Sequence, residues 1–129
     1  MSESFHLEII SPEQTLIKSE VKQVTIPAFE GLMTILRDHI PLVTFLRPGF
    51  IEVKTSSLSE KFYVEEGTVE FSRNNLLILS STAKNKKNFT PESARKMLER
   101  TSEKLKNTEL KDKEKYILSY KIEALREIN

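Results

Sequence analysis

The two histidines, and a few of the 19 acidic residues that lie in pairs with another such side chain, could carry acid–base chemistry or bind a metal ion. Asp38 directly precedes His39, and in catalytic triads a carboxylate orients an imidazole base. Glu65 and Glu66 form a second pair, which could bind a cation or exchange a proton. Adjacent residues of an extended chain point to opposite faces, so neither pair is expected to act together. We therefore expect Asp38 in a turn, His39 half-buried, and both glutamates at a solvated hairpin end.

Other common chemistries have little basis in the sequence. The other histidine, His6, alternates outward in its segment and is expected to be a surface residue. The three glycines form no phosphate-binding loop, no histidine or acidic cluster has metal-ligand spacing, and the absence of cysteine excludes disulfides. The basic run at residues 84–87 lacks the interleaved aromatic residues of nucleic-acid platforms, and a solvated linker is its simpler interpretation. We expect no catalytic residue, no metal ion and no nucleic-acid partner.

The charge distribution divides this chain of 129 residues, whose formal net charge is +1. Residues 1–83 carry 7 basic and 11 acidic side chains, a balance of −4, whereas residues 84–129 carry 13 and 8, a balance of +5. Such asymmetry suggests two regions with different partners. No run of about 18 apolar residues could span a bilayer. The N-terminal residues resemble neither a secretory signal nor a transit peptide, so we expect the protein to work where it is made.

The first region has the pattern of short β-strands. In FHLEI, the apolar residues Phe5, Leu7 and Ile9 alternate with polar ones, which indicates a strand with one buried face. Similar segments are KQVTI, FIEVK, KFYVE and TVEF, whereas NLLILSS is predicted to be a central strand buried on both faces. Turn signals recur about every 8–12 residues, and no helix-length pattern lies between the strands. Residues 1–84 are therefore predicted to form an antiparallel β-sandwich or barrel without parallel crossovers.

After Ala83 the pattern becomes helical. Thr90 can cap a helix, because its hydroxyl can accept a hydrogen bond from a free backbone N–H, and Pro91 suits the first helical position. Two apolar stripes at helical spacing follow. They comprise Ala94, Met97, Leu98, Thr101 and Leu105, and then Ile117, Tyr120, Ala124 and Ile128 with Leu118, Ile122 and Leu125 beside them. Residues 85–129 are predicted to form an antiparallel two-helix hairpin, which is too short to fold alone and must dock on the β domain or on another protein.

Several motifs resemble those of one known family. The chain begins FHLEIISPEQTL, where the family reads H-L-E-I-V-S-P-E. It continues IPAFEGLMTILRDHIPLVTFLRPGFI, where the family reads V-P-x-x-E-G-x-x-G-I-L-P-x-H-A-P-L-V-T-x-L-R-P-G-x-I. The segment KFYVEEGTVEFSRNNLLILSSTA matches a later strand, glycine turn and strand. Over nearly its whole length, the sequence resembles the epsilon subunit of F-type ATP synthases, which is called delta in mitochondria.

The resemblance implies a β-sandwich of about ten strands and a helical hairpin, as the periodicity does. It also implies a non-catalytic rotor subunit of the central stalk, which couples rotation of the c-subunit ring to ATP synthesis by the alpha/beta head through gamma. The expected location is peripheral, on the cytoplasmic face of the bacterial inner membrane, within the proton-translocating complex. The alternatives are a stand-alone β-sandwich adaptor with a helical arm, or a small hydrolase using His39.

The resemblance also assigns contact residues. The residues that match the gamma-facing part of the family are Ser11, His39, Pro41 and Thr44. The residues that match the part nearest the c ring are Glu30, Gly31, Leu32 and Met33. Glycine at position 31 allows a tight reversal. Leu32 and Met33 would then form an exposed apolar tip, with inward packing of one of them as the alternative.

Some positions depart from the family pattern. Certain bacterial members bind ATP through the motif [I/L]-D-x-x-R-A, which corresponds here to FTPESA, with Thr90 in place of the aspartate and Ser93 in place of the arginine. Without the guanidinium and the carboxylate, we expect no tight ATP binding and no cofactor. Glu66 replaces the first glycine of a common Gly-Gly pair, and Arg37 and Asp38 replace a proline and a small residue before His39.

In bacterial relatives the hairpin often acts as a brake, extending into the catalytic head so that its basic face meets an acidic loop of the beta subunit. The hairpin here has a surplus of basic residues compatible with that role, although solvated lysines are the ordinary case. The candidate regulatory contacts are Lys104, Lys111, Lys113, Lys115, Lys121 and Arg126. Inhibition of ATP hydrolysis by the hairpin is therefore a hypothesis.

Overall fold

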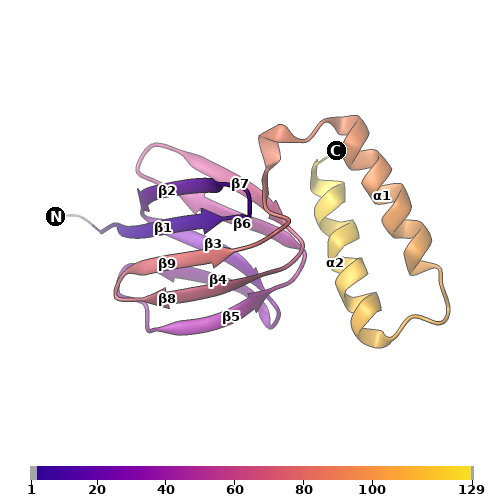
Figure 1. The fold of residues 1–129 in the computed structure, drawn as a ribbon, viewed down its shortest axis with the longest axis horizontal. Helices are drawn as coiled ribbons and strands as arrows, with labels where there is room; N and C mark the ends of the chain where they lie inside the picture. The colour runs from indigo at the N-terminus through magenta and orange to yellow at the C-terminus, as the bar shows by residue number, and fades with distance from the viewer. Residues whose placement is uncertain (1–2, 129) are drawn as a thin grey trace.

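In the computed structural model, which describes residues 3–128, strands precede two helices (Figure 1). The strands are β1 (Phe5–Ile10), β2 (Thr15–Val21), β3 (Gln23–Ala28), β4 (Gly31–Leu36), β5 (Leu42–Leu46), β6 (Gly49–Lys54), β7 (Ser59–Val64), β8 (Gly67–Ser72), β9 (Asn75–Leu79) and β10 (Lys84–Asn85). A short 3-10 helix η1 (Lys86–Asn88) leads to α1 (Pro91–Leu105) and α2 (Asp112–Ile128). The predicted order, a β-sandwich followed by a two-helix hairpin, is confirmed. The predicted division between residues 84 and 85 falls within β10 and stays a proposal.

The strands form one folded sheet in the order β10-β7-β6-β3-β5-β8-β9-β1-β2, with β4 paired to β3. Strand β3 pairs with β6 over its first half, through Val24 and Val53, and with β5 at its last residue, where Ala28 lies opposite Leu46. The β3–β5 pairing thus joins two layers at a corner. One layer contains β4, β3, β6, β7 and β10, and the other contains β5, β8, β9, β1 and β2.

One pairing differs from the antiparallel expectation. Strand β1 lies parallel to β9, in a register that places His6 beside Asn75 and Ile10 beside Leu79. Every other pairing among the described residues is antiparallel. The expectation of no parallel crossover was therefore wrong at this pair. Parallel strands are usually connected by a helix, but here the connection runs through strands of the opposite layer. The absence of a helical pattern between the strands therefore did not exclude a parallel pair.

The core lies between the two layers and follows the predicted alternation. Phe5, Leu7 and Ile9 of β1 are fully buried, and the Phe5 ring meets the Phe71 ring edge to face at 5.6 Å. In β9, Leu76 and Ile78 are buried, but Leu79 is 45 % exposed. The prediction that this strand is buried on both faces was wrong, because its outer face is open to solvent.

The hairpin follows the predicted capping and stripes. The Thr90 hydroxyl accepts a hydrogen bond from the Ser93 N–H at 3.1 Å, and Pro91 occupies the first turn of α1. Helix α2 lies between the sandwich and α1 (Figure 1). Ala124 and Leu125 of α2 are buried with Tyr63 of β7, and this second apolar cluster also includes Phe50, Phe89, Met97, Leu98 and Ile128. The hairpin therefore docks on its own β domain, one of the two partners expected for it.

Within residues 3–128, no helix combines the length and the apolar character needed to cross a membrane.

Candidate functional site

Asp38 and His39 do not face each other. Asp38 adopts a left-handed backbone conformation with φ of 66°, and its carboxylate accepts a hydrogen bond from the Asn74 amide at 2.9 Å. Asn74 in turn accepts one from the Asp38 N–H at 2.7 Å. The half-buried His39 ring lies 2.8 Å from the Ile40 carbonyl oxygen and edge-on to Phe71. Both expectations for the pair are confirmed, and the carboxylate does not orient the imidazole as a triad requires.

Glu65 and Glu66 diverge, as expected, but both are tied into hydrogen-bond networks. Glu65 accepts a hydrogen bond from the Tyr63 hydroxyl at 3.0 Å and pairs with Lys121 of α2 at 3.2 Å. Burial and the nearby Glu65 charge raise the pKa of Tyr63, so its phenol keeps the proton that it donates. The Glu66 carboxylate accepts from the Ser80 hydroxyl at 3.1 Å and the Ser81 N–H at 3.2 Å. Both glutamates lie in the β7–β8 connection, where Glu66 is exposed, as expected for a hairpin end, and Glu65 is half-buried.

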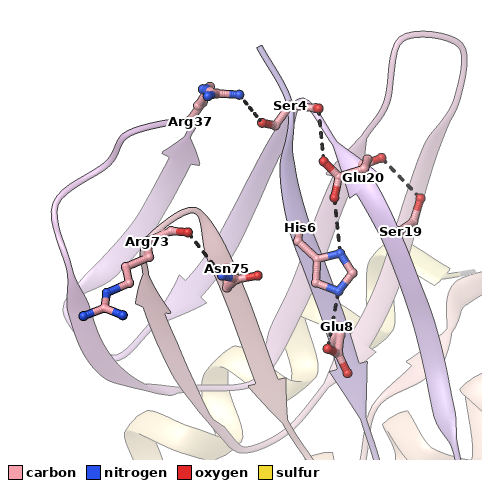
Figure 2. A network of polar contacts seen from close by, with 8 residues as sticks. All are labelled: Ser4, His6, Glu8, Ser19, Glu20, Arg37, Arg73 and Asn75. Atoms are coloured by element: carbon pink, nitrogen blue, oxygen red, sulfur yellow. Dashed lines mark hydrogen bonds and ion pairs between the residues drawn. The ribbon is translucent and has the colours of Figure 1, made fainter. Parts of the chain in front are cut away.

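His6 lies in a network of polar contacts on the β1–β2 surface (Figure 2). Its Nδ1 is 3.2 Å from a Glu20 carboxylate oxygen, and its Nε2 is 3.3 Å from one of Glu8. The Ser4 hydroxyl donates to the other Glu20 oxygen at 3.2 Å. Both ring nitrogens are thus engaged: the contact with Glu20 joins β1 to β2, and the contact with Glu8 lies within β1. Among the described residues, no group of three or more histidine or acidic side chains could hold a metal ion.

The residues predicted to contact gamma lie in one layer of the sandwich. Ser11 follows β1, and its hydroxyl donates to the Gln14 carbonyl oxygen at 3.1 Å. His39 and Pro41 lie in the segment that enters β5. Thr44 is buried within β5, where its hydroxyl donates to the Glu30 carboxylate at 3.4 Å. Thr44 thus faces inward, and its contact with gamma stays a prediction.

The neighbours of Thr44 in β5 form an exposed apolar surface that sequence reasoning missed. Val43 is 73 % exposed and Phe45 is 59 % exposed. The strand register places Phe45 beside Thr68 and Thr68 beside Leu79, which lies beside Ile10 of β1. We call Val43, Phe45, Leu77, Leu79 and Ile10 the outer apolar face. Period-two alternation around Thr44 was the signal that could have found Val43 and Phe45.

The residues predicted to contact the c ring form the β3–β4 turn. Gly31 has a φ of 142°, and Ala28 lies opposite Gly31 across the turn. Leu32 is 72 % exposed, whereas Met33 is half-buried and packs against the core. The alternative left open for the apolar tip is thereby decided: Leu32 points outward and Met33 inward.

The candidate regulatory residues of the hairpin divide into two groups. The side chains that are exposed are Lys104, Lys111, Lys113, Lys115 and Arg126. Lys121 instead faces the sandwich and pairs with Glu65. Thr90 and Ser93, which stand at the positions of the ATP motif, are both engaged in the helix cap, since Ser93 also donates its hydroxyl to the Thr90 carbonyl oxygen at 3.0 Å.

Comparisons with known proteins agree with this architecture. Residues 4–86 match the family model described as "ATP synthase, Delta/Epsilon chain, beta-sandwich domain". The ATP synthase epsilon chain of Pelagibacter ubique is 41 % identical over 130 residues, which cover the full length of both chains. The ATP synthase epsilon chain of Afipia carboxidovorans is 34 % identical over 106 residues, or 82 % of this chain and 78 % of that one.

Solved structures show the same fold at lower sequence identity. A chain in the Euglena gracilis mitochondrial ATP synthase superposes with a TM-score of 0.80 at 20 % identity, covering 98 % of this chain and 82 % of that one. A chain in the central stalk and c ring of the Tetrahymena thermophila mitochondrial ATP synthase gives a TM-score of 0.62 at 11 % identity, covering 95 % and 93 %. The sandwich, the hairpin, the matched family model and the full-length relatives together show that this chain belongs to the delta/epsilon family of ATP synthase chains.

Proposed function

We propose that this chain is a non-catalytic rotor subunit in the central stalk of a proton-translocating ATP synthase, where it joins the c-subunit ring to gamma. The observation that carries the proposal is the outer apolar face, which the hairpin leaves uncovered. Exposed apolar side chains gathered on one side of a layer, here with Thr68 and Glu70 of β8 between them, indicate a protein interface. Ser11 follows β1 beside this face, and His39 and Pro41 lead into the strand that presents it.

The charge on the same layer indicates what the surface of gamma should offer. Glu70 lies beside Val43 in the strand register, and Glu8 lies beside Leu77. Carboxylates therefore alternate with the apolar side chains of the outer apolar face. The complementary surface on gamma should be apolar with basic residues at its rim, because matched charges favour the correct register of two partners.

The β3–β4 turn is the second contact in this proposal. It presents the exposed Leu32 and the carboxylate-bearing Glu30 at one end of the sandwich, where polar loops of the c ring can rest. Within the complex the chain is a peripheral membrane component. We place it on the cytoplasmic face of the bacterial inner membrane, since relatives of comparable length, such as that of Pelagibacter ubique, are bacterial.

Capture of the tagged full-length chain from solubilised membranes tests the proposal. We expect gamma and the c subunits to be recovered with it and to stay bound during washing in about 0.15 M salt. At this ionic strength, exposed charges more than roughly 8 Å apart are largely screened. Recovery of an unrelated partner instead would favour the stand-alone adaptor. A purified chain with hydrolytic activity that His39→Ala removes would favour the hydrolase.

The exposed basic residues of the hairpin support a brake on ATP hydrolysis. Deleting residues 90–129 is expected to raise hydrolysis by the assembled catalytic head by roughly fivefold, the lower end of the coupling usual between sites in proteins. The measurement is steady-state ATP hydrolysis by the reconstituted head, gamma and this chain.

A charge-neutral variant controls for loss of packing on deletion. Lys104, Lys111 and Lys115 are all exposed, so their replacement by glutamine removes charge without removing buried surface. If the charges act as the brake, this triple variant reproduces part of the rise. An unchanged rate in both the deletion and the triple variant would eliminate the brake.

A further inference from the structure

A cluster of side chains joins the second helix of the hairpin to the β3–β4 turn. The Tyr116 hydroxyl donates a hydrogen bond to the Phe29 carbonyl oxygen at 2.6 Å and accepts one from the Arg47 guanidinium at 3.2 Å. The phenol thus acts as both donor and acceptor. These residues lie in α2, immediately before the turn, and immediately after β5, so three separate segments meet at one hydroxyl.

Ring contacts reinforce these hydrogen bonds. The Phe29 and Tyr116 rings are stacked with centroids 5.8 Å apart and an interplanar angle of 17°. Tyr120, one helical turn further on, meets Tyr116 edge to face at 4.9 Å, and the Arg47 guanidinium lies 3.8 Å from the centroid of its ring. We call Phe29, Arg47, Tyr116 and Tyr120 the tyrosine clasp. The Nε of Arg47 is buried and has no hydrogen-bond partner among residues 3–128, so the guanidinium depends on the clasp for its remaining contacts.

The clasp holds the turn on one side, while the other side is open. The Phe29 N–H donates to the Phe45 carbonyl oxygen at 3.0 Å, and the Arg47 N–H donates to the Pro27 carbonyl oxygen at 2.9 Å. Beyond Phe29, the Thr44 hydroxyl of β5 donates to the Glu30 carboxylate at 3.4 Å, whereas a Cβ added at Gly31 would meet no heavy atom within 4 Å. The position of the exposed turn is therefore set by β5 and α2.

We propose that Tyr116 is a positioning residue for the c-ring contact: by holding Phe29, the docked hairpin keeps the β3–β4 turn in the conformation that the ring binds. This inference rests on the proposed function, because it takes the turn as the ring contact. Two equilibria that share one element are coupled by the same factor in both directions. Docking of α2 strengthens binding of the ring, and binding of the ring favours the docked hairpin.

Hydrogen exchange of the full-length chain tests the first half of the inference. Tyr116→Phe keeps the stacked ring and removes the hydroxyl. We expect exchange of the peptide covering residues 28–33 to become roughly fivefold faster, the factor that corresponds to one net hydrogen bond. Tyr120→Phe is the matched control, because Tyr120 enters the clasp through its ring, and exchange in this variant should stay within about twofold of the parent chain.

Binding to a purified gamma–c-ring complex tests the second half. Tyr116→Phe should weaken binding several-fold while Tyr120→Phe does not, and the ring should slow exchange in α2 beyond what gamma alone does. Equal binding of both variants, or unchanged exchange in residues 28–33 of Tyr116→Phe, would overturn the inference. If a thermal melt shows that Tyr116→Phe is not folded, Phe29→Leu serves instead, because it removes the stacking and leaves the carbonyl acceptor. A parent chain that never binds the gamma–c-ring complex would refute the proposed function, whereas altered exchange of the turn would still reveal the clasp.

Discussion

Replacing Phe45 by glutamate should weaken binding of the chain to gamma by about 30-fold or more, which corresponds to a loss of at least about 2 kcal/mol. Phe45 is 59 % exposed on the outer apolar face, two residues from Val43 and across Thr68 from Leu79. A few residues contribute most of the binding energy of an interface, and large aromatic side chains are frequent among them. A carboxylate there would also be desolvated without a partner, which adds to the loss. Titration of labelled chain with purified gamma measures the change.

Leu58→Glu is the matched control for this prediction. Leu58 is 66 % exposed, similar to Phe45, but it lies in the β6–β7 connection of the opposite layer. The control introduces the same charge at another exposed apolar residue, and we expect it to leave the affinity for gamma within about twofold, as is usual away from an interface. Equal weakening by the two substitutions would indicate a nonspecific charge effect. Full affinity of Phe45→Glu would exclude the outer apolar face as the gamma contact.

Replacing Gly67 by alanine should lower the free energy of unfolding by about 3 kcal/mol. Gly67 begins β8 with a φ of 157°, and a Cβ there would lie 2.6 Å from the Leu79 carbonyl oxygen and 3.0 Å from Leu46 Cδ1. The carbonyl is part of the β-sheet backbone and cannot move aside without disturbing the pairing of β8 with β9. Overpacking and backbone strain each cost about 1–3 kcal/mol. Urea denaturation followed by circular dichroism measures the loss as a lower midpoint.

Gly31→Ala separates the two contributions. Gly31 also has a positive φ, 142°, but an added Cβ would meet no heavy atom within 4 Å. This variant carries backbone strain without the steric contact, and its loss should be about 1–2 kcal/mol. The difference between the two losses of unfolding free energy therefore measures the steric contacts with Leu79, Leu46 and Ser80. Equal losses would mean that the β8–β9 backbone relaxes around the new methyl group.

The sequence predicted the elements whose determinants are local. Alternation of Phe5, Leu7 and Ile9 identifies β1 because the side-chain period of a strand depends on neighbouring residues alone. The capping of α1 by Thr90 is likewise decided within one helical turn, and its hydrogen bond to Ser93 is observed. The family resemblance predicted the same order of a β-sandwich and a helical hairpin. It also predicted that the segments around His39 and Glu30 contact partner subunits.

The features that escaped prediction depend on residues far apart in the chain. The parallel pairing of β1 with β9 brings His6 beside Asn75, and local periodicity does not specify the partner of a strand. The tyrosine clasp joins Tyr116 to Phe29, which are 87 positions apart in the sequence. The outer apolar face was missed for another reason, since Val43 and Phe45 look like ordinary core residues until the direction of Thr44 is known.

The position of β1 also has a consequence for how a newly made chain matures. Strand β1 leaves the ribosome first, yet it lies between β2 and β9, and β9 ends at Leu79. Until β9 has been synthesised, one edge of β1 has no neighbour and the side chains of Phe5, Leu7 and Ile9 have no completed layer to cover them. Pairing across such a long loop forms slowly, and an open strand edge attracts other chains. The first strand to be translated is thus among the last to be enclosed, so nascent chains halted before residue 79 should aggregate and those halted beyond the hairpin should not.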